Sequence, residues 1–95
     1  METGAELIAK EYGEMRNKHG YTVQQDVHYN KGGQLRQAAV ALICDHGSGD
    51  ISNLPNGWND TLCRHMMEKT YKERLIIAGA LIAAEIDRIQ TEAKS

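Results

Sequence analysis

The sequence contains no phenylalanine, one proline and one tryptophan among its 95 residues, and four tyrosines are its only other aromatic residues. The core must therefore consist mainly of Leu, Ile, Val, Ala and Met, a set that suits packed helices. Two cysteines, Cys44 and Cys63, are too few for a disulfide framework. This composition favours a single all-α domain that spans residues 1–95. A chain of this length can form one modest core.

The chain also lacks a large net charge and long apolar runs. The formal net charge is −2, the isoelectric point is near 6.0 and the basic residues are scattered, whereas binding of bulk nucleic acid needs a cationic stripe. Residues 1–15 lack the apolar core of a signal peptide. No run reaches the roughly 20 apolar residues that span a bilayer. We therefore expect a cytoplasmic protein with reduced thiols and no membrane partner.

The spacing of apolar side chains predicts a compact bundle of three to four helices. Thr3 and Glu6 match the S/T-x-x-E capping box and begin the first helix. Leu35, Ala38, Ala39, Leu42 and Ile43 are expected to face the core from the second helix. The predicted helices span residues 5–18, 34–46, 58–68 and 71–90, the third capped between residues 56 and 59.

Residues 21–33 (YTVQQDVHYNKGG) lie between the first two predicted helices and show no helical period. We expect a long ordered loop here, with a short turn at 23–27, closed by Gly32 and Gly33. A loop of this length is uncommon in so small a domain and favours a functional role.

The last predicted helix is apolar on every side between residues 75 and 84 (LIIAGALIAA). Leu75, Ile82, Ile86 and Ile89 form one stripe along it, with Tyr71 and Gly79 beside them. A helix of this kind must be central or shared with a partner subunit. Its small residues, Gly79 among them, let another helix approach closely. The pattern predicts a homo-oligomer formed through this helix.

The loop and its surroundings form the candidate ligand site. Aromatic rings can stack on a base, Lys31, His28 and Arg36 are donors, and Gly33 precedes a helix whose free N–H groups favour a phosphate. Packing is the competing interpretation: tyrosines as lids over a small core, and Gly-Gly as a turn. The predicted ligand-binding residues are Tyr12, Tyr21, Thr22, Asp26, His28, Tyr29, Lys31, Gly33, Arg36 and Trp58.

Two metal-binding hypotheses are also open. Glu11 and Glu14, one helical turn apart, can hold Mg²⁺ together with Asp26. This is half of the pattern of all-α nucleotide pyrophosphohydrolases that resemble MazG, but no second ExxD-type motif is present, and a solvated acidic face is the simpler interpretation. Zinc could use Cys44, His46, Cys63 and His65, yet side chains two residues apart on a helix point in different directions. No catalytic residue is predicted, because no G-x-S-x-G motif or activated nucleophile is evident.

Two blocks of the sequence together resemble a family of short phage and prophage proteins. The first runs from Glu11 through GYT (20–22) and Asp26 to GQL (33–35) and Ala38-Ala39, and the second is ERLIIAGALIAAEIDRI (73–89). The family pattern is E-G-[YW]-T, a D-D pair, G-E-L-A-x-A-A, a Trp-containing loop and R-D-L-V-K-A-G-A-L-I-x-A-E-I-E-R. The match keeps this order from Glu11 to Ile89.

Val27, Gln34 and Ile77 stand where the family pattern has Asp, Glu and Lys. If those polar positions form a site in the relatives, this chain has lost much of it, which favours binding over hydrolysis. The resemblance implies a phage accessory protein in the host cytoplasm. By analogy, it would counter host defence by sequestering a nucleotide-like signal or blocking a host protein. The alternative is a Mg²⁺-dependent, MazG-like nucleotide pyrophosphohydrolase.

Overall fold

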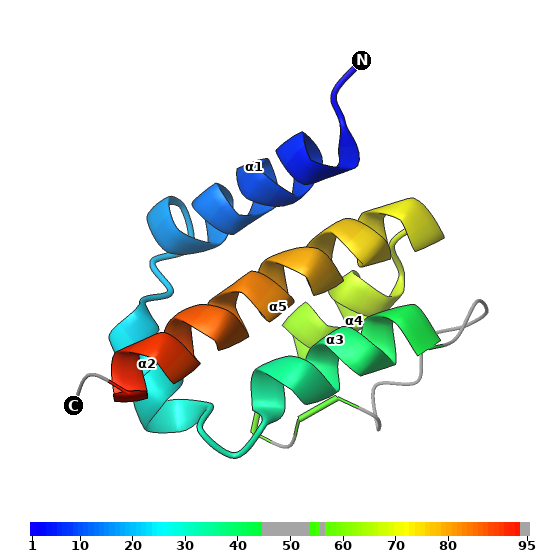
Figure 1. Cartoon of the computed structure of the whole chain (residues 1–95). Helices are drawn as coiled ribbons and strands as arrows, with labels where there is room; N and C mark the ends of the chain where they lie inside the picture. The colour runs from blue at the N-terminus through cyan, green and yellow to red at the C-terminus, as the bar shows by residue number, and fades with distance from the viewer. Residues whose placement is uncertain (45–53, 56, 94–95) are drawn as a thin grey trace.

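A computed structural model describes residues 1–44, 54, 55 and 57–93. Within these ranges the chain is all-helical, as predicted, although it has five helices where three to four were expected. The long last helix, α5, lies between α1 and α3 and contacts all four other helices (Figure 1). None of the described helices is both long and apolar enough to cross a membrane. The helices are α1 (Gly4–Asn17), α2 (Val23–Tyr29), α3 (Gln34–Cys44), α4 (Asp60–Met67) and α5 (Tyr71–Ala93).

Helix α2 occupies most of the segment for which the sequence predicted a loop, so that prediction was wrong for Val23–Tyr29. A capping box begins the helix. The Gln25 N–H donates to the Thr22 hydroxyl and the Thr22 N–H donates to the Gln25 side chain, both at 3.1 Å. Apolar periodicity misses this helix because it is two turns long and the residue it buries is the polar Asp26.

The other helix starts are set by similar local signals. The predicted capping box of Thr3 and Glu6 is confirmed at α1, and Asn59 caps α4 by accepting a bond from the Leu62 N–H at 3.0 Å. Thr70 and Glu73 bond each other reciprocally at the start of α5. Helix α3 ends at Cys44, and the predicted extension to His46 falls outside the described residues.

The core is built from small and aliphatic side chains, as the composition predicts. Four of the five core positions predicted on α3 are buried, but Ile43 is 37% exposed. Ile43 follows Leu42 and is therefore turned about 100° away from it around the helix. The buried hydrophobic residues are Met15, Leu35, Ala38, Ala39, Ala41, Leu42, Leu54, Cys63, Met66, Met67, Ile77, Ala78, Ala80, Leu81 and Ala84.

Helices α3 and α5 are also joined by a buried charge. Arg74 is 3% exposed, and its Nη1 donates to the Leu42 carbonyl in the last turn of α3 at 3.3 Å. The carbonyls at a helix C-terminus lack intrahelical donors and carry partial negative charge, so a guanidinium stabilises this end. The aromatic ring of Tyr71 lies 5.7 Å from the same guanidinium.

Helices α1 and α5 approach closely at Gly79, as expected for a small residue. A Cβ added at Gly79 would lie 2.6 Å from Cδ1 and 2.8 Å from Cγ1 of Ile8. The helix that uses this space is α1 of the same chain. The small residue therefore serves the fold of one subunit.

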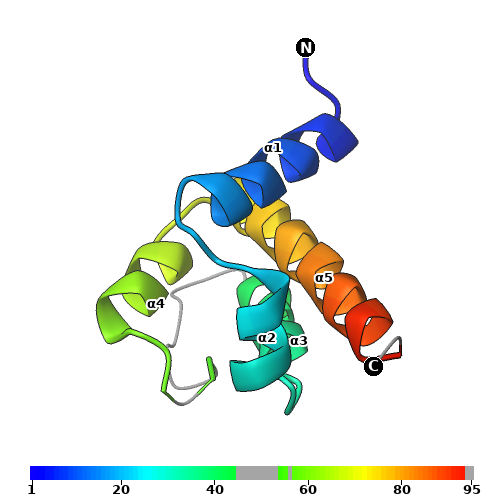
Figure 2. The same ribbon diagram turned by 90° about the vertical axis from the view of Figure 1, so that its left-hand side faces the viewer.

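The described residues leave one side of α5 uncovered. Tyr71, Leu75, Ile82, Ile86 and Ile89, here called the α5 stripe, are 41–52% exposed. In Figure 2, α4 lies to the left of α5, and no described helix is drawn to the right of α5. The predicted stripe therefore exists, but within one chain it faces outward and not into the core.

Candidate functional site

Arg16, near the end of α1, connects three helices. Its Nη1 donates to Asp26 of α2 at 3.0 Å, and its Nη2 donates to Asp87 of α5 at 3.3 Å. Nη1 also lies 3.3 Å from the Tyr21 carbonyl in the link between α1 and α2. The side chains of Arg16 and Asp26 are only 14% and 8% exposed, so this is a largely buried pair.

Three further side chains complete this group, here called the Arg16 cluster. The Tyr12 hydroxyl donates to Asp87, and the Arg16 guanidinium lies 5.0 Å from the centre of the Tyr12 ring. Asn30 donates to Asp26 at 2.9 Å, and the Trp58 indole N–H donates to Asn30 at 3.2 Å. The cluster contains Tyr12, Arg16, Asp26, Asn30, Trp58 and Asp87.

The electrostatics of the cluster keep Arg16 charged. Burial alone would lower the pKa of Arg16, but its contacts with Tyr12 and Asp26 outweigh burial, so the pKa lies above the ordinary value. The polar atoms of the cluster largely satisfy one another, although Nε of Arg16 is buried without a hydrogen-bond partner among the described residues. Such a closed network suits holding α1, α2 and α5 together better than receiving a ligand.

The remaining predicted ligand-binding residues lie outside this cluster. Thr22 is the cap of α2, and the ring of Tyr21 lies 6.2 Å from that of His19 on the surface. The second group, here called the α2–α3 corner, is the run from the end of α2 to the first turn of α3. It contains His28, Tyr29, Lys31, Gly33 and Arg36.

At the α2–α3 corner, Tyr29 is 69% exposed and its ring meets the His28 ring edge-on at 4.5 Å between centroids. Gly33 has a φ of +90°, which a residue with a side chain would adopt only with strain. The Arg36 side chain folds back over Gly33, with Nη2 3.0 Å from the position that a Cβ would occupy. Lys31 and Arg36 are exposed, and neither has an ion-pair partner within the described ranges.

Sequence reasoning therefore combined two separate groups of residues. Tyr12, Asp26 and Trp58 come together in the Arg16 cluster, whereas His28, Tyr29, Lys31, Gly33 and Arg36 form the exposed corner. Arg16 and Asp87 were missed. Arg16 was detectable in part, because it lies four residues after Tyr12 on one helix face, but nothing local indicates that Asp87 is its partner.

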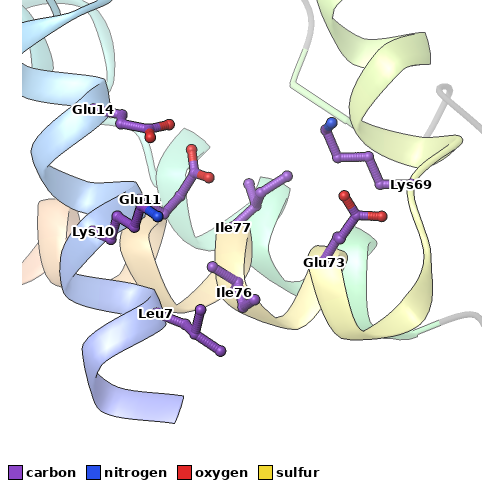
Figure 3. Close-up of a pocket in the computed structure, with 8 residues that line it drawn as sticks. All are labelled: Leu7, Lys10, Glu11, Glu14, Lys69, Glu73, Ile76 and Ile77. Carbon is purple, nitrogen blue, oxygen red and sulfur yellow. The ribbon is translucent and has the colours of Figure 1, made fainter. Parts of the chain in front are cut away.

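Two of the three carboxylates of the hydrolase alternative lie in a groove between α1 and the start of α5 (Figure 3). Glu11 and Glu14 face it from α1 and Glu73 from α5, above a floor that includes Ile76 and Ile77. The groove has a volume of about 200 Å³, below the roughly 300–1,000 Å³ typical of small-molecule sites. Asp26, the third predicted ligand, belongs to the Arg16 cluster.

Within the described residues, no three His, Cys, Asp or Glu side chains come close enough together to hold a metal ion. His46 and the Cys44 side chain, half of the zinc hypothesis, fall outside what the structure describes. Cys63 is 3% exposed, and its burial, together with the nearby Asp60, raises the pKa of its thiol. The protonated form of Cys63 is thereby favoured, and a thiol is a poor nucleophile compared with a thiolate.

Comparison of the chain with protein-family models, with curated proteins and with solved structures finds no match.

Proposed function

We propose that this protein acts by binding and not by catalysis, and that its ligand is a small nucleotide-like anion held at the α2–α3 corner. The observation that carries the proposal is the uncapped start of α3. Helices α1, α2, α4 and α5 begin at a Thr or Asn whose side chain accepts a backbone N–H. Gly33 has no side chain to do so, which leaves N–H groups at the start of α3 for an anion.

The neighbouring side chains can contact both the phosphate and the base of a nucleotide. Lys31 and Arg36 supply positive charge near the start of α3, and neither forms an ion pair with another described residue. The exposed Tyr29 ring offers a face on which a base can stack, an interaction worth about 1–3 kcal/mol. The formal net charge of −2 is no obstacle, because recognition of a small anion needs only local positive charge.

The family resemblance provides a biological setting for such binding. A phage accessory protein that holds a nucleotide-like signal would remove that signal from the host's defence. Blocking a host protein is a separate role, which absence of nucleotide binding would favour.

The test is calorimetric titration of the protein with linear and cyclic nucleotides, with inorganic phosphate as a reference anion. Arg36→Glu and Lys31→Glu are expected to weaken binding at least about tenfold, because each reverses a charge beside the phosphate. Tyr29→Ala should weaken nucleotide binding and leave phosphate binding unchanged, whereas Tyr29→Phe should retain both. The matched control is Arg64→Glu, the same charge reversal on α4. Absence of binding for every nucleotide, or equal losses in Arg64→Glu, contradicts the proposal.

One observation keeps the hydrolase alternative open: Glu11, Glu14 and Glu73 line the same groove. A Mg²⁺-dependent enzyme would have to bring Glu73 closer to Glu11 and Glu14, because these three carboxylates do not form a metal site in the described structure. Asp26 is bonded to Arg16 and Asn30. Release of pyrophosphate from nucleotides with Mg²⁺, lost in Glu11→Ala, would overturn the binding proposal.

A further inference from the structure

The α5 stripe runs along most of α5, from Tyr71 to Ile89. Its outer members, Tyr71 and Ile89, are 18 residues apart, or about 27 Å along the helix axis. Leu75, Ile82 and Ile89 are spaced by seven residues, the repeat of a helix that packs along another helix. The described helices leave this side of α5 open.

The area of the stripe is large for a chain of this size. If a fully exposed large residue presents roughly 200 Å², five residues at 41–52% exposure leave roughly 450 Å² of mainly apolar surface. The largest apolar patch on a typical monomer is about 300–600 Å² and is often functional. Two such stripes face to face would bury roughly 900 Å², close to the ~1,000 Å² expected of a specific interface, and their polar flanks would add the remainder.

The order of residues along the stripe points to the partner. Taken outward from Ile82 in both directions, bulky residues on one side match small or complementary ones on the other. Leu75 and Ile89 are each seven residues from Ile82. Tyr71 and Ala93 are each eleven residues from Ile82.

We propose that the α5 stripe binds the α5 stripe of a second copy of this chain, antiparallel, with the two-fold axis at Ile82. In this arrangement Ile82 contacts its own symmetry mate, and Leu75 contacts Ile89 of the second copy. Such reciprocal contacts are the property of a two-fold interface. A partner of unrelated sequence would not require the stripe to be complementary to itself.

The charges that flank the stripe are compatible with pairing. Arg88 forms ion pairs with Glu85 at 2.6 Å and with Glu92 at 2.9 Å. Hydrogen bonds from Arg88 to Glu85 are the largest reason that the pKa of Arg88 is raised. Arg88 therefore neutralises one of these two negative charges within each chain, which reduces the repulsion between two copies. The dimer does not depend on the proposed nucleotide site, because the α2–α3 corner shares no residue with the stripe.

The first experiment measures the mass of the whole chain in solution by sedimentation and light scattering. The expected species has twice the 10.6 kDa of the chain. Ile82→Glu should raise the dimer dissociation constant at least about tenfold, because the symmetry places two carboxylates in contact. Ile89→Glu, near the end of α5, serves as the second variant if circular dichroism shows that Ile82→Glu does not fold.

The control is Val40→Glu, which changes an apolar residue of similar exposure, 52%, on α3. Val40 lies two residues from both Ala38 and Leu42, so it points away from the buried face of α3. This variant should remain a dimer. A wild-type chain that is monomeric at every concentration, or a dimer that survives both α5 substitutions, would overturn the proposal.

The second experiment determines the orientation. Leu75→Cys protein and Ile89→Cys protein, one of them isotope-labelled, are mixed and oxidised, and the linked peptides are identified by mass spectrometry. A disulfide between residue 75 of one copy and residue 89 of the other is expected. Links of 75 to 75 and 89 to 89 would indicate a parallel pair and contradict the antiparallel arrangement.

Discussion

At the scale of single residues, the buried polar side chains divide into those that pair within one helix and those that join helices. Arg88 belongs to the first kind, since its partners Glu85 and Glu92 lie about one turn before and one turn after it on α5. Arg16 belongs to the second kind, because its two carboxylates come from α2 and α5. Losing Arg16 therefore costs both an ion pair and a connection between helices.

We predict that Arg16→Ala lowers the free energy of unfolding by about 3 kcal/mol, because it leaves the nearly buried Asp26 carboxylate without its cation. This loss is at the lower end of the range expected when a buried ion pair is broken, because the Asp87 side chain is 29% exposed. Urea denaturation followed by circular dichroism measures the change. Arg64→Ala, which removes an exposed arginine of α4, should change the same free energy by no more than about 0.5 kcal/mol. Equal effects of the two variants would show that the Arg16 cluster does not stabilise the fold.

The predicted site residues illustrate what residue type alone can indicate. Tyr12, Asp26 and Trp58 were predicted as ligand contacts because rings and carboxylates suit a nucleotide. In the structure they bond to Asp87, Arg16 and Asn30. A sequence shows which groups need partners, but the partner of Arg16 lies 71 residues away on α5. Only the packing of α1 against α5 decides that these groups satisfy one another.

At the scale of elements, the close packing of α1 on α5 depends on one missing side chain. Glycine in a helix interior costs about 0.5–1 kcal/mol relative to alanine, yet Gly79 stands in the middle of α5. The cost is offset because Ile8 occupies the space where a Cβ would be.

We predict that Gly79→Leu destabilises the chain by about 1–3 kcal/mol or more, because the added side chain overpacks the contact with Ile8. Thermal and urea unfolding measure this loss. Gly13 is the matched control: it lies inside α1, and a Cβ added there would meet nothing within 4 Å. Gly13→Leu should therefore be neutral or slightly stabilising through helix propensity.

A double variant separates overpacking from other causes. If the clash with Ile8 is responsible, Ile8→Ala combined with Gly79→Leu should be more stable than the sum of the two single changes predicts. Strict additivity of the two changes would argue that Gly79 is needed for another reason.

At the scale of the whole molecule, the core is rich in alanine and the α5 stripe is exposed in the single chain. Small domains often supplement a modest core by oligomerisation. If folding is coupled to the proposed dimerisation, stability must depend on protein concentration.

We predict that the apparent free energy of unfolding, expressed per mole of dimer, rises by about 1.4 kcal/mol for each tenfold increase in chain concentration. Thermal unfolding over a hundredfold range of concentration provides the measurement. The midpoint should rise with concentration for the wild type and for Val40→Glu, and should stay constant for Ile82→Glu. A constant midpoint for all three would mean that the chain folds and functions as a monomer.

The sequence by itself determined the helical class, the capped starts of α1 and α4, and the aliphatic composition of the core. These depend on local hydrogen bonds and on side-chain spacing, which act over a few residues. The tertiary structure decided that α2 is a helix with a buried aspartate, that the predicted site divides in two, and that the stripe of α5 faces outward. Each of these outcomes depends on which surfaces meet, and contacts between distant segments such as α1 and α5 leave no local pattern.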